Sequence, residues 1–155
     1  MESVDALPAY ATYHQRVAEF VRDISSRFPG GGLLVDVHGQ SDEPGTIFRG
    51  TRAGLTVKSL IARHGVSAVQ GEKSITGTLE AKGYHVMPST ASESLREDPR
   101  FAGGYTVFTY GSHRPGGIDA VQLEFGRTYR SNSRLADDFA DALLTFMSTY
   151  VSSSN

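Results

Sequence analysis

The order of hydrophobic patterns along the chain predicts an α/β fold, with a three-layer α/β/α arrangement around a mixed, mostly parallel sheet. Segments with a helical arrangement of apolar residues alternate with short apolar runs typical of strands. A length of 155 residues suits one domain, which we expect to span residues 1–155. Because the chain opens with a helical pattern, where such domains commonly open with a strand, we expect it to be the C-terminal part of a larger domain.

Helices are predicted over residues 10–28, 56–64, 74–82 and 135–150. Pro29 and the glycines after it end the first of these segments. Gly65 and Gly83 follow the second and third, where glycine commonly closes a helix. Asp137 and Asp138 lie in the first turn of the last segment, where negative charge favours the helix dipole.

Strands are predicted over residues 33–38, 84–87, 105–110 and 118–125. The first is a short apolar run with no polar alternation until its last residues, which is typical of a strand buried in a parallel or mixed sheet. The third is rich in β-branched and aromatic residues. In the last strand, Leu123 and Phe125 alternate with Gln122 and Glu124, so the two pairs face opposite sides. Between the second and third strands, a polar loop over 88–99 is expected at the surface.

The composition excludes several classes of protein. A net charge of -2 and the lack of a block of Lys or Arg argue against partners such as nucleic acids or membrane surfaces. No run approaches about 18 apolar residues, and the acidic start, Met1–Asp5, does not resemble an export signal, so a cytoplasmic location is expected. The chain has no cysteine, which leaves histidines and carboxylates as the ligands for any metal site.

Polar side chains follow the first buried strand at its carboxyl end, the edge where α/β sheets bind ligands. Asp36 and His38 lie two residues apart, so strand alternation places them on the same face. A neutral histidine there can bind zinc, and a neighbouring carboxylate fixes its tautomer. The alternative is a hydrogen-bonded histidine at the sheet edge, with Asp36 capping a loop.

Glu124 is the second candidate, because it ends an apolar strand. Partial removal from water raises the pKa of a carboxyl group towards the range of a general base. The alternative is an ion pair with Arg127 or Arg130.

Two arginines, Arg49 and Arg127, immediately follow strand-like segments and are candidates for binding a substrate carboxylate. Tyr105 and His113 are further candidates for substrate contact. The remaining histidines, at positions 14, 64 and 85, are expected to be structural or at the surface.

Four short motifs occur in a recognisable order: Leu-Leu-Val-Asp-Val-His-Gly at 33–39, Gly-Thr-Arg-Ala-Gly at 50–54, Phe-Ala-Gly-Gly-Tyr at 101–105 and Gly-Ile-Asp-Ala-Val-Gln-Leu-Glu-Phe-Gly-Arg at 117–127. In this order the chain resembles the second half of the N-formylglutamate amidohydrolase family, which is related to the zinc carboxypeptidases. The resemblance runs from about Tyr13 to the last helix and implies a phosphorylase/hydrolase-like α/β fold.

The resemblance implies a zinc-dependent amidohydrolase that cleaves an N-acyl amino acid, a small molecule with a carboxylate such as N-formylglutamate. His38 would bind zinc, Asp36 would support His38, and Glu124 would activate the metal-bound water. Arg49 and Arg127 would hold the substrate carboxylate.

One family feature is missing from the sequence. The wider group brings a further histidine and a nearby carboxylate to the zinc, yet none of the five histidines here has a glutamate three residues later. Catalytic zinc typically has three protein ligands. The chain is therefore either part of an enzyme completed by another segment, or a non-catalytic α/β module that binds a carboxylate ligand or a protein partner. A truncated sheet would also leave an unpaired edge, so self-association is expected.

Overall fold

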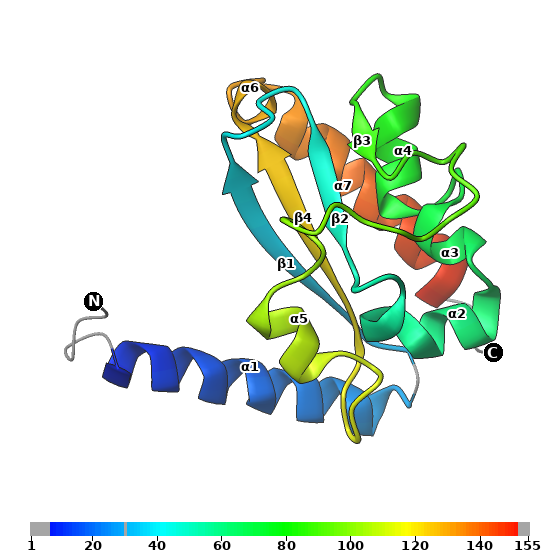
Figure 1. The fold of residues 1–155 in the computed structure, drawn as a ribbon. Coiled ribbons are helices and arrows are strands. Elements are labelled where there is room, and N and C mark those ends of the chain that lie inside the picture. Colours follow the sequence, from blue (N-terminus) through cyan, green and yellow to red (C-terminus); the bar gives the residue numbers. More distant parts are fainter. Residues whose placement is uncertain (1–6, 30, 152–155) are drawn as a thin grey trace.

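The computed structural model describes residues 7–29 and 31–151 and shows a mixed α/β fold around a four-stranded sheet (Figure 1). In spatial order the strands are β1 (Leu33–Gln40), β4 (Asp119–Gly126), β2 (Ile47–Gly50) and β3 (Val86–Met87). The β1–β4 and β2–β3 pairs are parallel, whereas β2 and β4 are antiparallel. The predicted α/β class and mostly parallel sheet are confirmed.

The helices predicted near both ends and in the middle of the chain are also confirmed. The described helices are α1 (Leu7–Arg27), α2 (Lys58–His64), α3 (Ser67–Gln70), α4 (Ile75–Ala81), α5 (Tyr105–Tyr110), α6 (Arg127–Arg130) and α7 (Leu135–Phe146). A 3₁₀ turn, η2 (Leu55–Val57), precedes α2, and a π-helical turn, η3 (Met147–Val151), continues α7. Among the described residues, no helix is long and apolar enough to cross a membrane. Met1–Asp5, on which the export prediction rests, lie outside the described residues.

The two faces of the sheet differ in character. Apolar side chains of β4, including Leu123 and Phe125, face the hydrophobic core, where Phe125 packs edge to face against Phe139 of α7. The opposite face carries the polar residues of β1 and β4. Because β1 pairs with β4 in register, His38 lies beside Glu124, and Asp36 lies beside Gln122. Strand alternation thus separates the core from the polar face.

The prediction of a strand over 105–110 is wrong, because these residues form α5. The position beside β4 is already taken on both edges, by β1 and β2. The 105–110 segment lies across β4 and β1 instead, with Val107 buried. A segment that crosses a sheet face cannot join its hydrogen-bonded ladder and must satisfy its own backbone groups, which a helix does. Tertiary position therefore overrides the β propensity of these residues.

The segment 88–99 has no regular structure, as predicted, but it is not wholly at the surface. Glu97 from this segment is buried against β2.

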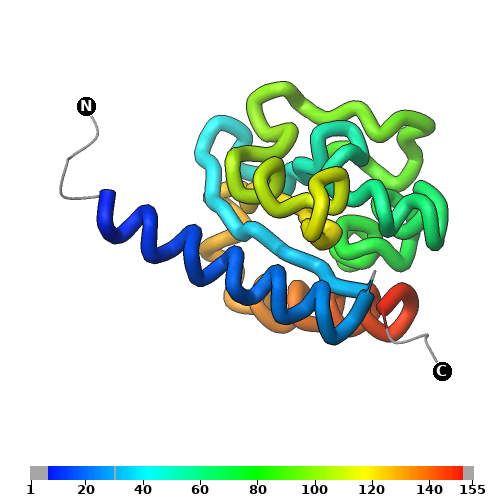
Figure 2. The backbone as a smooth tube through the Cα atoms, turned by 90° about the horizontal axis from the view of Figure 1, so that it is seen from below, coloured from blue at the N-terminus to red at the C-terminus, as the bar shows by residue number. Residues whose placement is uncertain are grey.

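Helix α1 is attached to the rest of the molecule less closely than the other long helix, α7. Two views at right angles show its N-terminal end extending beyond the sheet (Figures 1 and 2). Val21 is the buried residue of α1, whereas Phe20 within the helix and Phe28 just after it are exposed. The helix contacts α5 through His14, whose ring lies near those of Tyr105 and Tyr110.

Candidate functional site

Strands β1 and β4 bring four polar side chains together on the face that α5 covers. Asp36 and His38 come from β1, and Gln122 and Glu124 come from β4. Asp36 Oδ1 lies 3.0 Å from His38 Nε2, which is the contact expected from strand alternation. Asp36 is largely buried, whereas about half of the His38 side chain is exposed, so the ring can be reached from solvent.

Glu124 is held by a neighbour on its own strand. The Gln122 amide donates to Glu124 Oε1 at 3.0 Å, and its carbonyl oxygen accepts the Gly104 N–H at 2.7 Å. These two bonds fix the Gln122 amide between Glu124 and the start of α5. Burial raises the pKa of Glu124, while the charge of His38 and the Gln122 hydrogen bond oppose the shift. Among the described ion pairs, none joins Glu124 to Arg127 or Arg130, the alternative considered from the sequence.

Two glycines allow the chain to deliver Gly104 to this position. A Cβ added to Gly50 at the end of β2 would lie 2.5 Å from the Gly103 nitrogen, so the two segments cross with no room for a side chain. Gly103 also has a φ of 114°, which side chains other than glycine rarely tolerate. The Gly-Gly-Tyr motif therefore places the start of α5 over β4.

A pocket of about 350 Å³ opens between α1, α5 and the polar face of the sheet. Its lining residues are Tyr10, Tyr13, His14, Asp36, His38, Gly104, Tyr105, Thr106 and Gln122. Three of the residues selected from the sequence, Asp36, His38 and Tyr105, thus share one pocket. Glu124 adjoins it through its hydrogen bond to Gln122.

His14 lies in the wall of this pocket, although the sequence suggested a structural or surface role. The Tyr110 hydroxyl donates to the His14 carbonyl oxygen at 2.8 Å and lies 3.1 Å from Nδ1. Since that hydroxyl has one proton, which it donates to the carbonyl, His14 Nδ1 acts as the donor to its oxygen. The adjacent aromatic residues Tyr10 and Tyr13 were the available signal in the sequence.

Arg49 differs from the expected position at a strand end, because it lies inside β2 with only 1% of its side chain exposed. Its Nε donates to Glu97 at 3.1 Å, and its other nitrogens donate to the Val69 carbonyl at 3.0 Å and to the Gln70 side chain at 3.2 Å. A guanidinium with these buried partners holds β2 to the segments around it. This geometry supports a structural role for Arg49.

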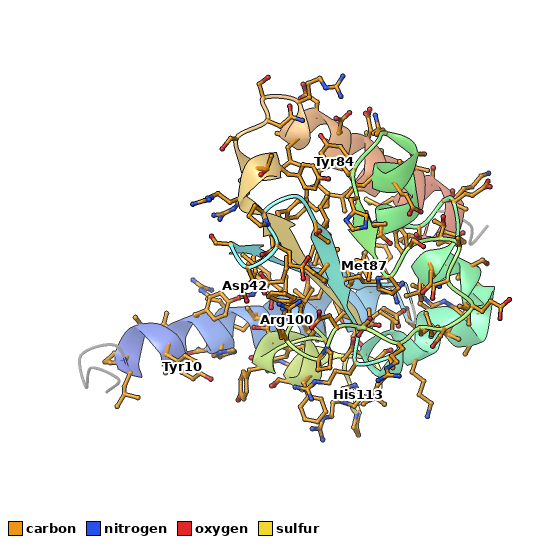
Figure 3. The ribbon with its side chains drawn as sticks, turned by 45° about the horizontal axis from the view of Figure 1, so that its top comes forward. Tyr10, Asp42, Tyr84, Met87, Arg100 and His113 are labelled. Carbon is orange, nitrogen blue, oxygen red and sulfur yellow. The ribbon has the colours of Figure 1, made fainter. Side chains whose placement is uncertain are left out.

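Two further candidates lie outside the pocket. Arg127 is exposed at the start of α6 and is not a lining residue. His113 follows α5, well separated from Tyr10 in Figure 3, with its ring 5.1 Å from that of Phe108. Both ring nitrogens of His113 are buried without a hydrogen-bond partner, and burial and the nearby Arg114 lower its pKa. The structure therefore does not bring His113 to the carboxylates of the site.

The residues of the site do not form a complete metal centre. Within residues 7–29 and 31–151, no group of three or more histidine, aspartate or glutamate side chains is placed to hold a metal ion. His38 and Asp36 are paired with each other, and Glu124 is bonded to Gln122. Zinc therefore does not fit this set of ligands alone.

No family model, curated protein or solved structure matches the chain.

Proposed function

We propose that this chain carries the water-activating part of an amide hydrolase, with Glu124 as the general base. The observation that supports it is the placement of Glu124 beside the Asp36–His38 pair and in hydrogen bond with Gln122, a lining residue of the pocket. A partly buried carboxylate with a raised pKa is suited to proton transfer near neutral pH. The resemblance to the N-formylglutamate amidohydrolases favours an N-acyl amino acid as the substrate.

In the proposed reaction, Glu124 takes a proton from water as the water oxygen bonds to the amide carbon. The proton then passes to the leaving nitrogen, and the C–N bond breaks to give a carboxylic acid and an amine. Gln122 donates to Oε1 of Glu124, so the proposal assigns the proton transfer to Oε2. Asp36 orients the His38 ring, which can then donate a hydrogen bond that stabilises negative charge developing on the carbonyl oxygen.

The test is release of amine from a panel of N-formyl amino acids, measured with the purified chain in excess zinc. The proposal expects slow hydrolysis of at least one member of the panel. Complete lack of turnover across the panel would contradict it and support the non-catalytic module.

The resemblance also implies zinc, for which the described residues do not form a complete site. We expect the purified chain, after incubation with zinc and removal of the excess, to retain far less than equimolar metal, because His38 is poorly supported as a ligand by itself. The metal content of the chain and of His38→Ala, measured by mass spectrometry, checks this expectation. Equimolar zinc that disappears in His38→Ala would show that the chain completes the site itself.

We also propose that the chain self-associates through β1. Among the described strands, β1 pairs with β4 on one side and with none on the other. Val37 of β1 is 57% exposed and faces away from His38. An unpaired edge with an exposed apolar residue is a template for strand addition.

Sedimentation over a concentration series is expected to show association that Val37→Lys weakens, because charge on an edge strand disfavours pairing. Val66→Lys is the matched control, since Val66 is also exposed but precedes α3. Equal association of both variants would rule out the β1 edge as the contact.

A further inference from the structure

The pocket has a carboxylate in its lining that no lysine or arginine of the lining neutralises. No lysine or arginine is among its lining residues. Asp36 lines the pocket, and Glu124 is bonded to the lining residue Gln122. His38 Nε2 lies 3.0 Å from the Asp36 carboxylate in the same lining. The lining therefore offers an acidic partner to a positive group and no lysine or arginine to a negative one.

The arginines expected to hold a substrate carboxylate do not change this balance. The Arg49 guanidinium is buried against Glu97, and Arg127 is exposed outside the pocket. The charge of Arg130 acts on Glu124, but Arg130 donates to the Gln40 carbonyl at 3.3 Å and lines a different pocket. A ligand carboxylate in the pocket between α1 and α5 would face Asp36 without a guanidinium among the lining residues.

The outer wall of the same pocket is aromatic. The His14 ring lies 4.4 Å from that of Tyr10, and 5.0 Å from those of Tyr13 and Tyr105. The rings of Tyr10 and Tyr105 are themselves 6.2 Å apart, so α1 and α5 both contribute to one group of rings. Aromatic faces carry negative potential and attract cations. The exposed ring of Tyr105 stands at the junction of the two helices with the pocket.

We infer that this pocket selects a cationic organic group, an ammonium or guanidinium, through the tyrosine rings and the Asp36 carboxylate. This inference rests on the proposed function and names its substrate class: N-acyl derivatives of basic amino acids or amines, in place of acidic ones. The aromatic rings contact the cation and its aliphatic stem, while Asp36 supplies the opposite charge. Tyr105 is thereby a specificity-determining residue.

The test compares three probes that share the same N-formyl and α-carboxylate groups: N-formyl-lysine, N-formyl-norleucine and N-formyl-glutamate. Their dissociation constants are measured by NMR titration of the chain in EDTA, so that binding is read without turnover. We expect the lysine derivative to bind about fivefold or more tightly than the norleucine derivative, which has a similar stem without the charge. The glutamate derivative is expected to bind most weakly.

Two substitutions at one position separate the ring from the hydroxyl group. Tyr105→Leu is expected to weaken binding of the lysine derivative by about threefold to tenfold, whereas Tyr105→Phe stays within about twofold of the wild type. The norleucine derivative should respond less to Tyr105→Leu, because it lacks the charge that the ring attracts. Chemical-shift dispersion of each variant confirms that it is folded.

Equal or tighter binding of the glutamate derivative overturns the inference, as does the failure of all three probes to bind. The outcome is separate from that of the proposed function, because binding is measured without hydrolysis. If the chain binds the lysine derivative selectively but hydrolyses no amide, the inferred preference for cations is supported and the proposed enzymatic function is contradicted. If the chain hydrolyses amides but prefers the glutamate derivative, the proposed enzymatic function is supported and the inferred preference for cations is contradicted.

Discussion

Replacing Arg49 with methionine is expected to lower the free energy of unfolding by about 3–5 kcal/mol, the range for removing one partner of a buried ion pair. Only 1% of the side chain of either Arg49 or Glu97 is exposed. Loss of the guanidinium leaves the Glu97 carboxylate buried without its cation. It also removes the donors to the Val69 carbonyl and the Gln70 side chain.

Glu97 makes this loss more severe because it organises the turn after β2. Its carboxylate accepts the Thr51 N–H at 2.9 Å, the Ala53 N–H at 3.1 Å and the Thr51 hydroxyl at 2.6 Å. Arg52 and Ala53 both have positive φ in this turn, a conformation that needs support from its surroundings. A displaced Glu97 would release the turn as well as the ion pair.

Urea denaturation of Arg49→Met and of Arg127→Met measures this effect with a matched control. Arg127 is exposed, so its substitution is expected to change the unfolding free energy by less than about 0.5 kcal/mol. A loss below about 1 kcal/mol for Arg49→Met, together with weaker substrate binding, would instead support the substrate-binding role suggested by the sequence.

Replacing Glu124 with glutamine is expected to reduce kcat for amide hydrolysis by about 10²–10⁴-fold, the usual contribution of a general base. Glutamine keeps the shape of the side chain and a carbonyl oxygen that can accept the Gln122 hydrogen bond. The stability of the protein should therefore change little, while the proton acceptor is lost. Glu93→Gln, an exposed substitution in the segment before Glu97, is the control and should retain full activity.

The pH dependence provides a second measurement of the same role. Only the deprotonated carboxylate accepts a proton, so kcat/KM should fall as the pH drops through the pKa of Glu124. Because burial raises that pKa, the midpoint of the acidic limb is expected above the ordinary value of 4.5. An unchanged rate in Glu124→Gln, or an acidic limb that remains in that variant, would assign the base to another group.

The sequence was sufficient for the side chains of the site that share one strand. Alternation along β1 places Asp36 and His38 on one face, and alternation along β4 does the same for Gln122 and Glu124. The apolar residues between them predict which face is buried. These are local properties, because the direction of each side chain follows from the strand backbone itself.

The sequence was insufficient where distant segments compete for the same position. Residues 105–110 have strand composition but become α5, since β1 and β2 already occupy both edges of β4. From the sequence, Arg49 was expected at a strand end. In the structure it is buried against Glu97, which comes from a segment expected at the surface. His14 lines the pocket because α1 contacts Tyr110 of α5.

The sequence by itself determined the α/β class, the main helices, and the faces of the strands that carry Asp36, His38 and Glu124. The tertiary structure decided the strand order, the burial of Arg49 and the aromatic wall that α1 and α5 build beside the carboxylates. The physical reason is that helical and strand periodicity act over a few neighbouring residues. Pairing, burial and the charge of a pocket depend on which distant segments meet, and hydrophobic pattern alone does not specify that choice.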